Sequence, residues 1–292
     1  MRSLLAASLL VAATTAVLGG SAGAQAAEAA AAAAECDTTI TGQDTDGRLN
    51  KASGVNGVIN ENYQTAEPAP WSLRALHSIG GSGGNGTWNT SFLAPATDGD
   101  LRVVNLHGTE GDPTLTAESH DTVATRWRPY VMPSGSGFKL YTIKQDGDIL
   151  MREVGTGSDG TTELGAYETL PVAATDTRAA GVFWIRLADG TERDVIYATN
   201  GETGALRQII VDPENPASAK SYTLAGTGFK AFTHLKAGSC GGESISVVGV
   251  NSKAGNARWF EHAAPLSHSG STLSTRQPVG TDGQWQGWTG IG

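Results

Sequence analysis

Hydrophobic and polar positions along residues 35–292 alternate or run together in short stretches, without the sustained 3.6-residue spacing of an amphipathic helix. Leu140–Ile143 and Val195–Tyr197 are typical stretches, rich in β-branched and aromatic residues. Turn residues separate them, and the Asp-Gly pairs at Asp46 and Asp146 are favoured two-residue hairpin turns. The pattern predicts an all-β chain.

A larger unit repeats along the chain: an aromatic-led stretch, a β-rich stretch, a turn, a second β-rich stretch and a weaker fourth one. The turns begin at Asp46, Gly108, Asp146, Asn200 and Asn251, which lie 62, 38, 54 and 51 residues apart. A repeat of this length is typical of a solenoid, a propeller or an array. Four strands per unit favour the blade of a propeller.

The first unit, which starts near Thr38, has no aromatic opening stretch, and Gln284–Gly292 at the other end of the chain has the character of the missing one. An open solenoid would instead carry polar capping units. We therefore predict a five-bladed β-propeller of four-stranded antiparallel blades. The C-terminal strand joins the N-terminal blade and closes the ring.

The second unit is the shortest in its spacing. Only 38 residues separate its turn at Gly108 from the next turn, which predicts a short or missing outer strand. The run Gly80–Gly84 is interpreted as a connector between blades, and Trp88–Leu93 as the innermost strand of the second blade.

Residues 1–34 have the character of a signal peptide and an Ala-rich leader, so residues 35–292 are expected to form a single β-propeller domain. A membrane anchor is the alternative for the leader, although its apolar run is short for a spanning helix. Lipid attachment at Cys36 is disfavoured because Glu35 stands where a small residue is needed. We expect a secreted, extracellular protein without membrane insertion.

Cys36 and Cys240 are the two cysteines of the chain, and in an exported protein they predict a disulfide. A closed ring brings the first and last units together, which places the two residues near each other. Such a bond stabilises the fold by up to about 5 kcal/mol in the chain-entropy account.

The formal net charge of −9 and the absence of a basic run exclude nucleic acid as an expected partner. The six histidines show no ligand spacing, and the Asp-Gly-Asp segments fit hairpin turns better than calcium loops. We therefore expect no metal and no cofactor. Ser82 matches the G-x-S-x-G pattern but lies in a glycine run rather than at a strand-to-helix turn.

One aromatic residue recurs at a similar place in each unit. The simpler interpretation is that these rings pack between blades, and the alternative is a repeated binding site, because aromatic faces also bind the apolar faces of sugar rings. The candidate ligand-binding residues are Trp88, Trp127, Trp184, Phe232 and Trp288.

Catalytic residues are not indicated. A propeller glycosidase needs paired or triple carboxylates around its central channel, and the expected innermost strands contain none. We therefore expect that the protein is not an enzyme.

With these features the units resemble the tachylectin-2 family of five-bladed propeller lectins, whose members bind N-acetylated hexosamines with one site per blade. The resemblance rests on an opening aromatic stretch, on L-Y-x-I or V-I-Y-x-T, on D-G-x-L or G-x-L-R, and on closing runs such as Trp288–Gly292. It covers nearly all of residues 35–292. The chain departs from the family in its irregular unit lengths and in lacking a constant sugar-contacting motif.

The resemblance implies a secreted, lectin-like propeller without catalytic activity that binds glycans or polysaccharide, with N-acetylated amino sugars recognised at repeated sites. The alternatives are a secreted propeller glycoside hydrolase or lyase acting on polysaccharide, and a scaffold that binds other proteins. The oligomeric state is not indicated by the sequence.

Overall fold

The computed structural model describes residues 35–125, 127 and 131–292. Within these ranges the chain forms nineteen β-strands and three short 3-10 helices, and it has no α-helix there. Residues 34–292 form one compact unit. The all-β prediction is confirmed, whereas the predicted signal peptide at residues 1–34 lies outside the described residues.

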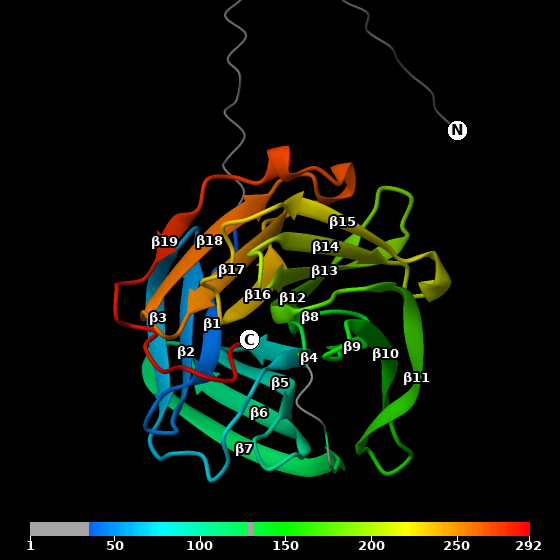
Figure 1. Ribbon diagram of the computed structural model, residues 1–292. Helices are drawn as coiled ribbons and strands as arrows, with labels where there is room; N and C mark the ends of the chain where they lie inside the picture. The colour runs from blue at the N-terminus through cyan, green and yellow to red at the C-terminus, as the bar shows by residue number, and fades with distance from the viewer. Residues whose placement is uncertain (1–34, 126, 128–130) are drawn as a thin grey trace, which may run out of the picture. The chain divides into compact units, whose positions relative to one another are not determined.

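The strands pair antiparallel in groups that follow one another along the chain (Figure 1). The first two groups are β1 (Ile40–Gln43), β2 (Leu49–Val55) and β3 (Val58–Thr65), then β4 (His77–Gly84), β5 (Thr87–Pro95), β6 (Leu101–Thr109) and β7 (Asp112–Ala124). The third is β9 (Leu140–Ile143), β10 (Asp148–Thr156) and β11 (Thr162–Ala173). The fourth and fifth are β12 (Thr177–Arg186), β13 (Glu192–Asn200), β14 (Leu206–Val211) and β15 (Lys220–Ala225), then β16 (His234–Ser239), β17 (Ile245–Asn251), β18 (Asn256–His262) and β19 (Gln277–Val279). The 3-10 helices η1 (Pro216–Ser218), η2 (Pro265–Ser267) and η3 (Gly270–Thr272) lie in the connections.

The innermost strands of these groups meet at β8 (Ser134–Ser136), which pairs in parallel with β4, β12 and β16. Gly135 makes this meeting possible. A Cβ atom there would lie 2.1 Å from the Val182 carbonyl oxygen and 2.7 Å from that of Ala237, so no larger residue fits. Successive antiparallel groups whose inner strands converge are the arrangement of a β-propeller.

Apolar residues are buried between neighbouring groups rather than within one group. Tyr141 and Ile149 of the third group pack with Val182 and Ile196 of the fourth. Four further clusters join the fourth group to the fifth, the fifth to the first, the first to the second and the second to the third. Each group therefore depends on its neighbours for its core.

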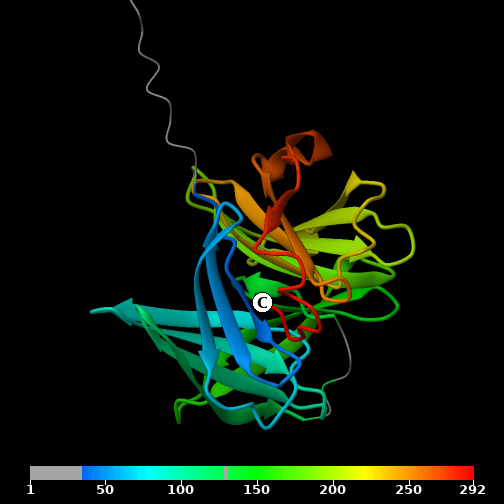
Figure 2. The same cartoon turned by 90° about the vertical axis from the view of Figure 1, so that its left-hand side faces the viewer.

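The C-terminal segment lies antiparallel beside β1. The Thr41 amide donates to the Gly292 carbonyl oxygen at 2.9 Å, and the Gly292 amide donates back at 2.8 Å. Gln43 and Thr289 exchange a second pair of backbone hydrogen bonds. Figures 1 and 2 both mark the C-terminus among the inner strands.

The disulfide between Cys36 and Cys240 is confirmed. It joins the segment before β1 to the segment after β16, and the Asp37 amide donates to the Ser239 carbonyl oxygen beside it. The bond therefore fastens the first group to the last across 204 residues of chain.

The second group corrects several expectations. The run Gly80–Gly84 is not a connector, because it belongs to β4 and pairs with β5 up to a hairpin turn at Asn85 and Gly86. Trp88–Leu93 consequently lies in the second strand of its group. The outer strand is neither short nor missing, since β7 has 13 residues.

Gly108, which was predicted to begin a turn, explains why the outer strand was expected to be short or missing. It lies inside β6 rather than in a turn, and a Cβ atom there would lie 2.3 Å from the Trp88 ring. The glycine is required by an indole packed against the backbone, not by a positive φ.

No helix among the described residues is long and apolar enough to cross a membrane.

Candidate functional site

A cavity of about 300 Å³ lies where the inner strands of several groups converge, and we call it the central cavity. Hydroxyl groups dominate its polar lining, and two phenyl rings and three charged side chains complete it. The lining side chains are Thr39, Thr41, Ser53, Ser78, Thr90, Ser136, Phe92, Phe183, Asp37, Lys51 and Lys236, with Ala237 and backbone from Gly135, Gly238 and Gly292.

Strand pairing explains how the first group contributes to the cavity. Thr41 of β1 lies opposite Lys51 of β2 in the antiparallel register. Ser53 follows two residues after Lys51, and side chains two apart on a strand share a face. The face of this group that meets the cavity is therefore polar, whereas its Ile40 and Ala52 are buried in the apolar cluster with the fifth group.

Lys236 and Asp37 form an ion pair at the wall of the cavity. The Lys236 Nζ atom lies 3.0 Å from Asp37 Oδ2 and donates a second hydrogen bond to the Thr39 carbonyl oxygen at 2.6 Å. Burial alone would raise the pKa of Asp37, but the Lys236 ammonium and hydrogen bonds from Thr39 outweigh it and hold the pKa below its usual value. Asp37 is therefore an ionised partner for Lys236 and a poor proton donor.

Lys51 is the second ammonium of the cavity. Its Nζ atom lies 3.5 Å from the centroid of the Trp88 ring, which is a cation–π contact. No described carboxylate lies within ion-pair distance of it. Burial, and then the nearby Lys236 charge, lower the pKa of Lys51.

Trp88 connects the cavity to the side of the second group. Besides covering Gly108 it packs edge-on against Tyr63, with ring centroids 5.5 Å apart. The Tyr63 hydroxyl donates to Glu61, which is exposed. Of the five candidate aromatic residues, Trp88 is thus the one whose ring lies over a charged residue of the central cavity.

Trp184 stacks on Phe183 of the cavity lining, with ring centroids 6.0 Å apart, whereas the other three candidates are not among the lining residues named above. Trp127 lines a separate cavity of about 650 Å³ with Tyr167 and Arg152, and Trp184 packs on Phe138 with ring centroids 5.1 Å apart. Phe232 and Trp288 are only 4% and 8% exposed and belong to apolar clusters. The structure does not bring the five rings to one site, and a sugar-binding role for each stays a prediction.

Asp194 is a buried carboxylate that does not line the central cavity. Its Oδ2 accepts from the Tyr141 hydroxyl at 2.7 Å and its Oδ1 from the Phe138 amide at 3.1 Å. Burial raises its pKa to about 6 against the effect of these hydrogen bonds. Because its oxygens bond the third group, the contacts point to a structural role.

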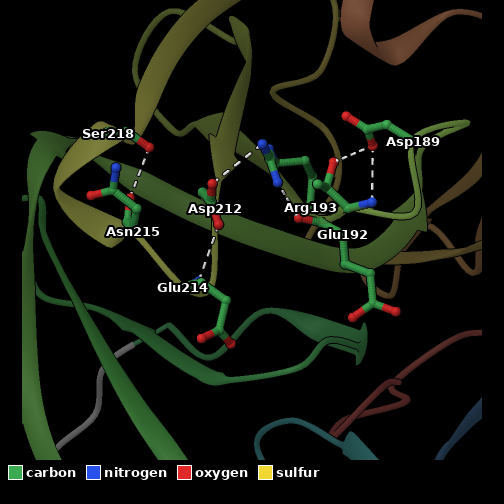
Figure 3. A network of polar contacts seen from close by, with 8 residues as sticks. Asp189, Glu192, Arg193, Asp212, Glu214, Asn215 and Ser218 are labelled. Carbon is green, nitrogen blue, oxygen red and sulfur yellow. Dashed lines mark hydrogen bonds and ion pairs between the residues drawn. The ribbon is translucent and has the colours of Figure 1, made fainter.

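Neighbouring charged side chains form hydrogen bonds and one ion pair (Figure 3). Arg193 lies 3.2 Å from Asp212 Oδ2, whose other oxygen accepts from the Glu214 amide at 3.1 Å. Asp189 accepts from the amide and hydroxyl of Thr191. This network holds the β12–β13 turn and the segment after β14 in place.

Among the described residues that line the central cavity, no group of three His, Cys, Asp or Glu side chains lies close enough together to bind a metal ion. The group of three candidate ligands in the described ranges is Cys36, Cys240 and Glu261, and both sulfur atoms are taken up in the disulfide.

Sequence reasoning missed the charged residues of the cavity. Asp37, Lys51 and Lys236 come from the two ends of the compact unit, and no spacing relates them. The available signal was a lysine in each of two strands that contain no acidic residue, at Lys51 in β2 and at Lys236 in β16.

No family model and no curated protein matches this chain. Among solved structures, a GH43_1 enzyme from Xanthomonas citri is 14% identical, over 84% of this chain and 88% of that chain, with a TM-score of 0.36. CoXyl43, a GH43 β-xylosidase/α-arabinofuranosidase from a compost microbial metagenome in complex with xylotriose, is 12% identical over 86% and 92%, with a TM-score of 0.37. The WD40 domain of SCAP from fission yeast is 8% identical over 80% and 71%, with a TM-score of 0.30.

Two of these similar structures are enzymes, so the expectation that this chain is not an enzyme does not stand.

Proposed function

We propose that residues 35–292 form a closed five-bladed ring whose central cavity binds carbohydrate. Five apolar clusters between successive groups support the blade count, the one between the fifth and first groups included. The backbone hydrogen bonds of Thr41 and Gln43 to the C-terminal segment support closure by that segment. We propose export as well, on the character of the leader.

The observation that carries the carbohydrate proposal is the lining of the central cavity. Hydroxyl side chains from the first group, the second group and β8 surround the cavity, and the Phe92 and Phe183 rings border it. Hydroxyls both donate and accept, which matches the hydroxyl groups of a sugar, and ring faces cover its apolar side. Ligand sites are concave places where a few polar groups converge among apolar ones.

The enzymatic alternative has a specific requirement. Hydrolysis by two carboxylates needs an acid and a second carboxylate on either side of the glycosidic bond. Asp37 is the one carboxylate among the described lining residues, and it forms an ion pair with Lys236. Sugar binding is common to a lectin and to a hydrolase, and it is the function that the lining of the cavity supports, so turnover is measured alongside it.

A glycan array with purified residues 35–292 tests the proposal, followed by incubation of each bound glycan and analysis for shortened or unsaturated products. N-acetylated amino sugars, which the tachylectin-2 resemblance implies, form one set on the array. Selective binding that Thr90→Val weakens supports the central cavity as the site. Thr223→Val, at an exposed position of β15, is the matched control.

A blank array overturns the carbohydrate proposal. Binding that survives Thr90→Val and Phe183→Ala unchanged moves the site elsewhere, with the cavity of Trp127 and Tyr167 as the next to test.

A further inference from the structure

The central cavity carries an unbalanced charge. Two ammonium groups, Lys51 and Lys236, line it with a single carboxylate, Asp37. The chain as a whole is acidic, with a formal net charge of −9, so this local excess of positive charge does not reflect the overall composition.

The two lysines are in different situations. Lys236 has its carboxylate and a carbonyl acceptor at 3.0 and 2.6 Å. Within the described part of the chain, the one close partner of the Lys51 ammonium is the face of the Trp88 ring. Two acids, Asp37 and Glu61, act on Lys51 electrostatically; Asp37 is paired with Lys236, and Glu61 is exposed and accepts a hydrogen bond from Tyr63. An ammonium without a carboxylate partner is left facing the cavity.

Placing a second ammonium beside the first has an electrostatic cost. The lowered pKa of Lys51, caused by burial and by Lys236, is the sign of that cost. A bound anion would relieve it, because it supplies the missing negative charge and accepts charge-assisted hydrogen bonds from both lysines.

We infer that the saccharide held in the central cavity carries an anionic group, a carboxylate or a sulfate ester, bound by Lys51 together with Lys236. This inference rests on the proposed function and names its ligand class. The hydroxyls of Thr39, Thr41 and Ser53 lie beside the lysines and bind the neutral hydroxyl groups of the same sugar. A cavity of about 300 Å³ is at the lower end of ligand sites, so it accommodates a short acidic saccharide rather than a wide polymer surface.

The test is a binding measurement with matched pairs of sugars. Each neutral sugar is paired with its acidic counterpart: galactose with galacturonate, glucose with glucuronate, and N-acetylated hexosamine with its sulfate ester. The inference predicts at least about tenfold tighter binding of one acidic form than of its neutral partner, the effect of one charge-assisted hydrogen bond. The uronate and sulfate arms distinguish the two sources of the charge.

The outcomes separate the two proposals. Equal or tighter binding of neutral sugars overturns the anionic ligand and leaves carbohydrate binding intact. No binding of any sugar overturns both.

Substitution locates the charge on the protein. With the tightest acidic ligand, Lys51→Met should lower the affinity about tenfold or more, and Lys51→Arg should keep most of it. Lys253→Met, at an exposed lysine in the β17–β18 turn, is the control and should change nothing.

A variant that fails to fold is recognised by its melting curve, and a salt titration of the unaltered protein then decides. Affinity for the acidic ligand should fall as ionic strength rises, because salt screens charge–charge attraction. Binding that does not depend on salt overturns the inference.

Discussion

The Tyr141 hydroxyl donates a hydrogen bond to Asp194 Oδ2 at 2.7 Å, and this bond joins β9 of the third group to β13 of the fourth. Both side chains are fully buried, within or beside the apolar cluster of those groups. The Phe138 amide donates a hydrogen bond to the other carboxylate oxygen, so Asp194 alone bonds two positions of the third group.

Tyr141→Phe should lower the free energy of unfolding by about 1.5–3 kcal/mol, the effect of losing a hydrogen bond to a charged group. Denaturant unfolding measures it. Tyr222→Phe is the control, because the Tyr222 ring is only half-buried and stacks on His268. Equal stability of the Tyr141→Phe variant and the unaltered protein would show that the bond adds nothing.

His77 should make stability depend on pH. It is 1% exposed, and burial lowers its pKa to about 4 from 6.5. In the unfolded chain His77 is protonated below about pH 6.5, whereas in the folded chain it stays neutral down to about pH 4. Its contribution is complete above pH 6.5 and is lost as the pH falls toward 4, by about 3 kcal/mol at most.

The measurement compares unfolding of the unaltered protein with that of His77→Gln from pH 7 to pH 4. The gap in stability between them should narrow or reverse toward low pH. Parallel curves would mean that His77 titrates alike in the folded and unfolded chain.

Gly108→Ala should displace the Trp88 ring, because the added methyl group would lie 2.3 Å from it. Overpacking of this kind costs about 1–3 kcal/mol, and near-ultraviolet circular dichroism should report the moved indole. Since Trp88 faces Lys51, ligand binding in the central cavity should weaken too.

Gly84→Ala is the matched control for this substitution. Gly84 also lies in a strand of the second group, but nothing lies within 4 Å of an added methyl group. A Gly108→Ala variant as stable as Gly84→Ala would contradict the packing of Trp88 described above.

Removing the disulfide with Cys36→Ala and Cys240→Ala together should lower the free energy of unfolding by about 2–5 kcal/mol, because the bond closes a long loop in the unfolded chain. Thermal unfolding with and without reductant measures it. Reductant should destabilise the unaltered protein and leave the double variant unchanged. An effect of reductant on both proteins would point to something other than this bond.

The second group shows why part of the fold was not predictable. Gly80–Gly84 and Gly108 have the composition of turns, yet all of them lie in strands. Glycine marks a turn when the backbone needs a positive φ, and it equally marks a strand against which another side chain packs closely. Only the position of the Trp88 ring distinguishes the two cases at Gly108.

The central cavity shows the same limit for the site. Lys51 and Lys236 are 185 residues apart in the chain, and each stands alone among residues of no distinctive chemistry. Their electrostatic interaction and their shared carboxylate arise from the convergence of β2, β16 and the segment before β1.

Residue patterns alone predicted the all-β character of the described residues, the hairpins around Asp46 and Asp146, and the pairing of Cys36 with Cys240. The expected two-residue turns are wrong in length, because β1 ends at Gln43 and β2 begins at Leu49, and β9 ends at Ile143 and β10 begins at Asp148. These features depend on local alternation, turn chemistry and a count of two cysteines, all of which are properties of the chain alone. The packing of the strand groups, by contrast, sets which aromatic rings are core and brings two lysines and one aspartate to one cavity. Burial and electrostatics depend on distances in space, and the packing of strand groups against one another sets those distances.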